Sequence, residues 1–302
     1  MYLFASTNTY DILYYMKHAS QEQFGPYTAT EENMEEPSRH QGVELLKQTP
    51  PGNIPGRKYE RSDKTHIPID EIVTALNSGP DALDHSLSKA SHEFREKISS
   101  TRWGNKVFRF FEKCATAENP DWPVYTFQIQ RDINQLDNTV KNRFSSVLAE
   151  WHAAQLLERL DKNVQSAQAH YALDAGAGVD LLFYIPEENS EGSFFAVQVK
   201  KDTTRLTPKV ESIEEAISAE ADDRVRKGFE NCRMAAIQMG KQASKKYIPL
   251  VMRVPTYDKL LEQKLVDNRT LAFTNTPGVD KWNAEMISYF RNKKYKKETY
   301  GK

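Results

Sequence analysis

The chain has 302 residues, of which 39% are hydrophobic and 27% are charged, and its formal net charge at pH 7 is −1. This length and composition predict a globular protein that buries a sizeable core. The near-zero charge excludes a binder that relies on a strong overall positive charge, so any contact with nucleic acid must come from local basic patches.

The two cysteines, Cys114 and Cys232, stand alone, without the CxxC or CxxH spacing of a zinc site. This usage favours a reducing compartment. The first residues lack the basic start of a signal peptide, and no apolar run reaches the length of a membrane span. We therefore expect an intracellular protein, in the cytoplasm or nucleoid or, in a eukaryote, the nucleus, with no membrane partner.

Residues 1–139 are predicted to form an N-terminal arm and a mostly helical region. Residues 21–68 are rich in proline and have little periodicity, which is typical of an arm or wrapped loop. The elements expected around this arm are a short aromatic-rich helix at 1–18, helices at Ile69–Leu76, Asp81–Ser99 and Lys106–Ala115, and a short strand at Tyr125–Ile129. This region either recognises the substrate or caps the core.

A strongly periodic helix is expected from about Val140 to Leu160, because its apolar residues recur at helical spacing. Two acids lie on or near the apolar stripe: Glu150 at its flank and Glu158 close to its middle. His152 is expected at the surface, since adjacent helical residues point in different directions.

Two apolar runs that carry polar residues then flank a polar loop. The runs Asp180–Ile185 and Ser193–Lys201 are predicted strands, and the loop between them has turn composition. If the runs pair as an antiparallel hairpin across this loop, Asp180 lies opposite Gln198. Lys200 lies two residues further along the same face of the sheet.

A carboxylate, an amide oxygen and an ammonium group at one place suit a hard divalent cation beside a phosphate. The alternative is an edge hairpin whose polar residues face water. Asp174 is an additional candidate acid just before the hairpin, after a predicted strand at Val164–Leu173. The small residues 175–178 allow a tight turn, but they are not a phosphate-binding loop, because a strand follows them.

The chain beyond Lys200 is basic at first. Lys201, Arg205 and Lys209 either contact a phosphate backbone or face solvent. Further elements are expected in the order of one or two helices over Ser212–Lys246, a core strand at Tyr247–Val254, a short strand at Leu271–Thr274 and a basic tail from Arg291. The order helix, strand, strand, strand, helix, strand predicts an α/β core with a central mixed β-sheet flanked by helices.

The tripeptides Gly178-Val179-Asp180 and Gln198-Val199-Lys200 together resemble the PD-(D/E)xK nuclease superfamily. That superfamily includes restriction endonucleases, Holliday junction resolvases and the endonuclease subunit of Tn7-like transposases. Gln198 is a departure, since many members have Asp or Glu there, although Gln-x-Lys variants occur. The resemblance covers roughly residues 141–255 and implies a restriction-endonuclease-like core within 140–302, followed by a C-terminal extension and a basic tail.

The resemblance also implies an activity, namely Mg²⁺-dependent hydrolysis of DNA phosphodiester bonds, with Mn²⁺ as a substitute and RNA not excluded. The superfamily places a metal-binding Glu on the helix before its core strands, and the stretch AEWHAAQLLERL is similar to that helix, with Glu150 in the matching place and Glu158 in reserve. Asp180, Glu150, Gln198 and the Val199 carbonyl would hold the metal, and Lys200 would orient or deprotonate the attacking water. A homodimer and a role in restriction, transposition, repair or defence follow by the same analogy.

Two other hypotheses are open from the sequence. One is a nucleic-acid-binding or assembly protein that keeps the nuclease fold with weak or no catalysis, which the neutral Gln198 favours. The other is a structural α/β domain with an accidental motif. The latter predicts that Asp180, Gln198 and Lys200 do not lie together.

Overall fold

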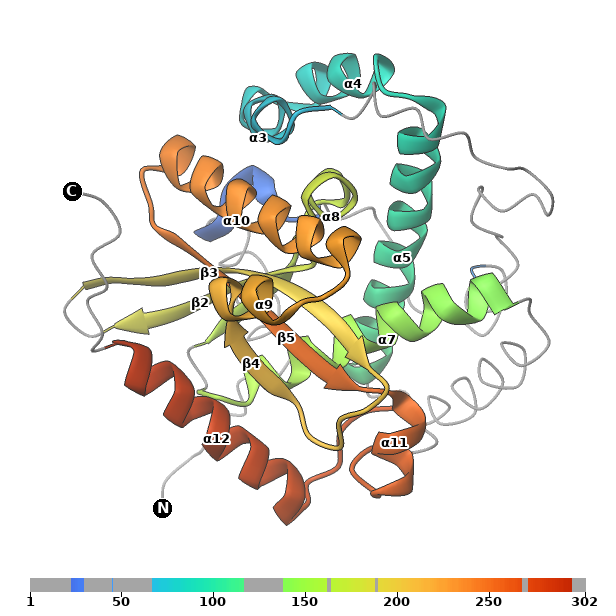
Figure 1. Ribbon diagram of the computed structural model, residues 1–302, viewed down its shortest axis with the longest axis vertical. Helices are drawn as coiled ribbons and strands as arrows, with labels where there is room; N and C mark the ends of the chain where they lie inside the picture. Colours follow the sequence, from blue (N-terminus) through green and yellow to red (C-terminus); the bar gives the residue numbers. More distant parts are fainter. Residues whose placement is uncertain are drawn as a thin grey trace, which may run out of the picture.

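The computed structural model describes residues 23–29, 45, 67–116, 138–161, 164–187, 190–267 and 271–294, which form a five-stranded sheet with helices on both faces (Figure 1). The helices are η1 (Gly25–Tyr27), α3 (Ile69–Ser78), α4 (Pro80–Ser88), α5 (His92–Thr116), α7 (Asn138–Glu158), α8 (Tyr171–Ala177), α9 (Ile213–Ala219), α10 (Asp223–Ala243), α11 (Tyr257–Glu262) and α12 (Pro277–Lys294). The strands are β1 (Gln165–Gln168), β2 (Leu181–Glu187), β3 (Ser190–Asp202), β4 (Lys209–Ser212) and β5 (Tyr247–Pro255).

The sheet is mixed, with the strand order β1-β2-β3-β5-β4. The central pair β3 and β5 is parallel, while β1–β2, β2–β3 and β4–β5 are antiparallel. A parallel pair needs a long crossover, and here the crossover from β3 to β5 contains β4, α9 and α10. The predicted fold class, α/β with a central mixed sheet flanked by helices, is therefore confirmed at this coarse level.

The register of the β2–β3 hairpin is the predicted one. Leu181 pairs with Val197, and the pairing continues in step to Ile185 and Ser193. The predicted loop was too long, however, because β2 continues to Glu187 and β3 already starts at Ser190, with an irregularity between Ile185 and Glu187. Polar residues can extend a hairpin where its strands leave the core, so composition alone misplaces the loop.

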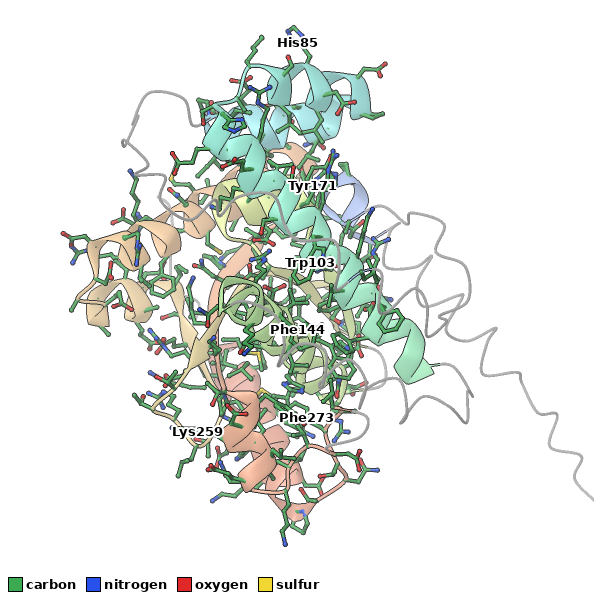
Figure 2. All side chains as sticks on the ribbon, turned by 90° about the vertical axis from the view of Figure 1, so that its right-hand side faces the viewer. His85, Trp103, Phe144, Tyr171, Lys259 and Phe273 are labelled. Carbon is green, nitrogen blue, oxygen red and sulfur yellow. The ribbon has the colours of Figure 1, made fainter. Side chains whose placement is uncertain are left out.

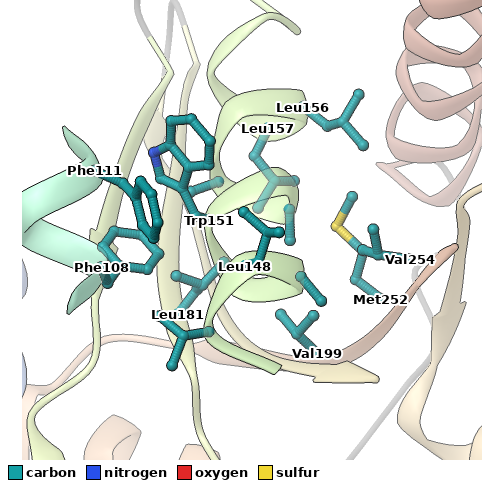
Figure 3. Close-up of a cluster of buried hydrophobic side chains, with 14 of the residues drawn as sticks. Phe108, Phe111, Leu148, Trp151, Leu156, Leu157, Leu181, Val199, Met252 and Val254 are labelled. Carbon is teal, nitrogen blue, oxygen red and sulfur yellow. The ribbon is translucent and has the colours of Figure 1, made fainter. Parts of the chain in front are cut away.

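The two faces of the sheet bury separate hydrophobic clusters. On one face, Leu182 and Ala196 pack with Phe229 of α10 and Leu173 of α8. On the other face, alternate strand residues pack against α7 and the C-terminal elements, as Figure 3 shows for Leu181, Val199, Leu148, Trp151 and Met252. The alternation of side chains along β3 thus divides its residues between two helical layers.

Helices α4 and α5 correct two predicted boundaries. The predicted helix Asp81–Ser99 is interrupted after Ser88, and the new start is marked by Ser91, whose Oγ accepts a hydrogen bond from the Phe94 N–H at 3.1 Å. Helix α5 then runs to Thr116, so the helix predicted at Lys106–Ala115 is its second half.

The strand predicted at Val164–Leu173 is wrong in its second half, where α8 begins at Tyr171. The ring Nδ1 of His170 accepts a hydrogen bond from the Ala172 N–H at 3.2 Å and so satisfies a free donor at the helix start. Gly178 ends α8 with a φ of 67°, a left-handed conformation that glycine adopts without strain.

Toward the C-terminus, the predicted helical stretch Ser212–Lys246 forms two helices, α9 and α10, and the predicted core strand is β5. The strand predicted at Leu271–Thr274 is reduced to a single bridge between Val266 and Phe273. The elements predicted at 1–18 and Tyr125–Ile129, most of the arm and the tail beyond Lys294 lie outside the described residues. Among the helices that the structure describes, none is long and apolar enough to cross a membrane.

His152 is buried, not at the surface as predicted. Its side chain is 1% exposed, and its Nε2 donates a hydrogen bond to the Leu271 carbonyl at 2.7 Å. The ring also packs against Phe273 and Tyr257. Burial lowers the pKa of His152 to about 4, and the same cause lowers the pKa of His170 to about 4.

These two histidines predict a loss of stability in mild acid. The unfolded chain takes up protons near the ordinary pKa of 6.5, whereas the folded histidines resist protonation down to about pH 4. The free energy of unfolding is therefore expected to fall as the pH drops from 6.5 to 4, by up to about 1.4 kcal/mol per pH unit for each buried histidine. Urea titrations of wild type and His152→Gln across this range measure the effect, and the variant should show a shallower slope.

His85 provides the control for this measurement. It is exposed on α4, at the end of the molecule remote from Phe273 (Figure 2). The His85→Gln variant should keep the pH dependence of the wild type. An equal loss of slope in both variants would contradict the assignment to His152.

Candidate active site

Asp180 lies immediately before β2 and is held by two backbone groups of β3. Its N–H donates to the Val197 carbonyl at 2.9 Å, and its Oδ2 accepts a hydrogen bond from the Val199 N–H at 2.6 Å. The carboxylate thus takes the place of a main-chain acceptor where the β2–β3 ladder ends. The Asp180 side chain is buried, and the hydrogen bond from the Val199 N–H fixes one of its oxygens against the central strand β3.

Gln198 lies beside Asp180, one step beyond the last paired residues of the hairpin, Leu181 and Val197. Two glycines make room for its amide. A Cβ at Gly178 would come within 2.6 Å of Gln198 Nε2, and a Cβ at Gly228 of α10 within 3.5 Å. Gln198 is buried, and its Oε1 has no hydrogen-bond partner among the described residues. A buried amide oxygen without a partner costs free energy, which a bound cation would recover.

Glu150 reaches the same region from α7, where it is 5% exposed. Burial is the main cause that raises the pKa of Glu150, and the charges of Asp180 and Asp174 add to it. Glu158 lies elsewhere: it is exposed, and its carboxylate accepts a hydrogen bond from Ser166 of β1 at 2.8 Å. Of the two candidate helix acids, the structure brings Glu150 to Asp180.

Burial raises the pKa of the two buried acids, Asp180 and Glu150. The pKa of Asp180 is raised to about 8, mainly by burial and also by the charge of Asp174, while the charge of Lys200 lowers it. Asp174 itself had been only an additional candidate acid. Asp180, Glu150 and Asp174, called here the acid cluster, lie within electrostatic reach of one another, and this proximity opposes ionisation of Asp180 and Glu150.

Arg143 is a member of the site that sequence reasoning missed. It lies on α7 seven residues before Glu150, which is two helical turns, so both side chains are on the same face of the helix. Its Nη2 is 3.7 Å from the Asp174 carboxylate. Burial lowers the pKa of Arg143, but the neighbouring carboxylates outweigh burial and raise it overall. In the sequence, the signal for Arg143 is its spacing of seven residues from Glu150, which places both on one face of a helix.

Lys200 begins a row of three cations across the sheet. The β3–β5 register pairs it with Arg253, and the β4–β5 register pairs Arg253 with Lys209. The ring of Phe229 on α10 covers the first two, with Lys200 Nζ 5.8 Å and Arg253 Cζ 5.9 Å from its centroid. The buried Glu211 accepts hydrogen bonds from Arg253 Nε at 2.6 Å and from Lys209 Nζ.

The three predicted nucleic-acid contacts do not form one group. Lys209 belongs to the cation row, whereas Lys201 is on the opposite face of β3 from Lys200, because neighbouring strand residues alternate. Arg205 lies in the following turn with its Nε 3.4 Å from Asp202, whose carboxylate also accepts a hydrogen bond from the Thr204 N–H. The residue that lies beside Lys209 in the cation row is Arg253, which strand pairing places there, and not Lys201 or Arg205.

The donor set suits a hard cation by type. Asp180 and Glu150 interact electrostatically and Gln198 follows the residue paired with Leu181, and hard divalent cations prefer such oxygen ligands. The described part of the chain contains no group of three His, Cys, Asp or Glu side chains placed to hold a metal ion, so the acid cluster by itself is not such a group. Any metal would depend on Gln198 and on a main-chain carbonyl such as that of Val199.

Comparisons with family models, with curated proteins and with solved structures find no match for this chain. The function of the site is therefore inferred from its own residues.

Proposed function

We propose that the protein is a metal-dependent endonuclease with a restriction-endonuclease-like core that hydrolyses phosphodiester bonds in DNA. The observation that carries this proposal is the meeting of Asp180 and Gln198 at one end of the β2–β3 hairpin, with Lys200 two residues along β3. The buried Glu150 joins them from α7. The hypothesis of an accidental motif expects Asp180, Gln198 and Lys200 to lie apart, so their shared place in the hairpin counts in favour of the proposal.

The residues that would hold Mg²⁺, or Mn²⁺ in its place, are Asp180, Glu150, Gln198 and the Val199 carbonyl. The Oε1 of Gln198, which has no partner among the described residues, and the buried carboxyl groups of Asp180 and Glu150, whose pKa values are raised, are the features of this site that a cation would satisfy. When bound, a divalent cation supplies Lewis-acid stabilisation of the phosphate charge and makes a bound water more acidic.

Lys200 would orient or deprotonate the water that attacks phosphorus and would stabilise the charge that develops on the phosphate. The Asp180 carboxylate is held in place by the Val199 N–H and needs no reorganisation for this chemistry. The expected products carry a 5′-phosphate and a 3′-hydroxyl. The cation row from Lys200 to Lys209 gives the DNA backbone a path away from the acids.

A second function is a nucleic-acid-binding or assembly protein with weak or no catalysis. Gln198 favours it, because a neutral amide binds a metal more weakly than a carboxylate does. Under either function, the partner is DNA, with RNA as a further substrate to test. A homodimer is part of the proposal, since two sites are needed to cut both strands in one encounter.

The experiment that tests the proposal incubates the purified chain with plasmid DNA, single-stranded DNA and RNA. Each substrate is tested with Mg²⁺, Mn²⁺, Ca²⁺ or EDTA, and the product ends are mapped. We expect cleavage of DNA with Mg²⁺ or Mn²⁺, none with EDTA, and 5′-phosphate ends. Binding without cleavage under all conditions would favour the second function, and neither binding nor cleavage would exclude both.

A further inference from the structure

Arg143 presents an unused hydrogen-bonding edge inside the candidate site. Its Nε and Nη2 atoms are buried and have no hydrogen-bond partner among the residues that the structure describes. These two nitrogens form one side of the planar guanidinium, the side that binds two oxygens of a carboxylate or phosphate at once. Buried charged donors without partners are rare, because each costs free energy, so this edge is suited to a ligand.

The surroundings of Arg143 keep that edge in place. Gly104 of α5 leaves the space for it, since a Cβ there would lie 3.0 Å from Arg143 Nη2 and 3.4 Å from Nε. A glycine inside a helix costs about 1 kcal/mol relative to alanine, and the guanidinium gives a physical reason for it here. Asp174, at 3.7 Å, is close enough for ionic attraction but beyond hydrogen-bonding distance.

The charge balance of the site indicates what the edge would bind. Arg143 faces Asp174, Glu150 and Asp180, and Lys97 of α5 lies within electrostatic reach of it. Asp174 lies 3.7 Å from Nη2, longer than a normal hydrogen bond, and all three carboxylates attract the guanidinium. A divalent cation held by Glu150 and Asp180 would neutralise much of that attraction. The guanidinium edge is then available to an anion that approaches the cation.

We propose that Arg143 binds the scissile phosphate through its Nε and Nη2 atoms, holding two of its oxygens beside Asp180 and Lys200. This role rests on the proposed nuclease function and adds a substrate-binding residue from α7 to the three positions on the hairpin. It also gives α5 a part in the site, because Gly104 sets where the guanidinium lies.

The test compares Arg143→Lys and Arg143→Ala with the wild type in two measurements. The first is the affinity for a short fluorescent DNA duplex with Ca²⁺ in place of Mg²⁺, and the second is single-turnover cleavage with Mg²⁺. Lysine keeps the charge and loses the two-pronged geometry. We expect Arg143→Lys to lose about ten- to a hundredfold in one or both measurements, and guanidinium ion added to Arg143→Ala to restore part of the loss.

Arg159 is the matched control. It follows the end of α7, and its guanidinium donates to the Phe273 and Thr274 carbonyls at 3.0 and 3.4 Å, away from the acid cluster. Arg159→Lys should lower thermal stability and leave DNA affinity and cleavage within about twofold of wild type. Gly104→Ala should lower DNA affinity with Arg143 still present, because the added methyl displaces the guanidinium.

The outcomes separate this inference from the nuclease proposal. If wild type binds and cleaves DNA while both Arg143 variants match Arg159→Lys, Arg143 is a structural counter-ion and the inference is wrong although the function stands. If wild type binds without cleaving and Arg143→Lys loses affinity, Arg143 binds a DNA phosphate that is not cleaved, and the nuclease proposal fails. Circular dichroism shows whether Arg143→Ala is folded. If it is folded and added guanidinium ion restores neither DNA affinity nor cleavage, the two-oxygen contact is excluded. Absence of DNA binding by wild type overturns both.

Discussion

Replacing Asp180 by Asn is expected to abolish cleavage and, in the metal-free protein, to raise the free energy of unfolding. Cleavage should fall by about a thousandfold or more, because the carboxylate charge that holds the cation is lost. Asparagine can still accept the hydrogen bond from the Val199 N–H through its amide oxygen, so the fold is kept. Gel-based cleavage and urea denaturation in EDTA measure the two effects.

The gain in stability follows from the raised pKa of Asp180. In the folded state this pKa is about 8, against an ordinary value of 3.8, so folding retains a proton that the unfolded chain releases. In the metal-free wild type, the contribution of Asp180 to the free energy of unfolding should therefore be largest below about pH 4. It should fall as the pH rises from there to about 8. Near pH 8, Asp180→Asn should gain on the order of 2 kcal/mol, roughly 5 °C in Tm, and the slope with pH should flatten.

The two acids of α7 provide a comparison for Asp180→Asn. Glu150→Gln should also reduce cleavage and raise the free energy of unfolding, since burial and the charge of Asp180 raise the pKa of Glu150 too. Glu158→Gln should not reduce cleavage, because its carboxylate lies outside the acid cluster and accepts a hydrogen bond from Ser166, although burial raises the pKa of Glu158 as well. Loss of cleavage in Glu158→Gln with full activity in Glu150→Gln would reverse the assignment of the helix ligand.

Replacing Lys200 by Ala is expected to reduce cleavage by about 10²- to 10⁴-fold, the range for removal of a group that transfers a proton or stabilises transition-state charge. The ammonium lies on the same face of β3 as Gln198, above the ring of Phe229. The loss should appear mainly in the single-turnover rate, with DNA affinity in Ca²⁺ lowered far less, because only one backbone contact is removed.

Lys201 is the control, since it is the next residue along β3 and faces the opposite side of the sheet. Lys201→Ala should cleave within about threefold of wild type. Equal losses in the two variants would mean that general charge on β3, and not the position of Lys200, supports cleavage. Equal activity in wild type and Lys200→Ala would remove Lys200 from the mechanism.

Several features of this protein could be predicted from local sequence. The β2–β3 register followed from the period of two in both runs and from the turn residues between them, so Asp180 beside Gln198 was predictable. The helix from 138 to 158 followed from its apolar stripe. Both patterns lie within a short stretch of chain, where backbone geometry alone relates one residue to the next.

Other features depended on which elements lie against each other. A helical wheel put Glu158 nearer the centre of the apolar stripe of α7, and only the resemblance favoured Glu150; in the structure Glu150 is the acid that is buried and within electrostatic reach of Asp180. His152 is buried because residues 271–273, more than a hundred positions later, pack over it. Arg253 and Lys200 are neighbours only through the parallel pairing of β5 with β3.

One physical reason explains why some features could be predicted from the sequence and others could not. Side-chain alternation and helical periodicity are properties of the backbone and are present in any short segment, so they identify strands, helices and the residues that share a face. Burial, charge proximity and the shift of a pKa arise when segments distant in sequence exclude water from one another. Asp180, Gln198 and Lys200 could thus be predicted as a group from the hairpin, whereas Glu150, Asp174 and Arg143 joined them only when α7 and α8 packed against it.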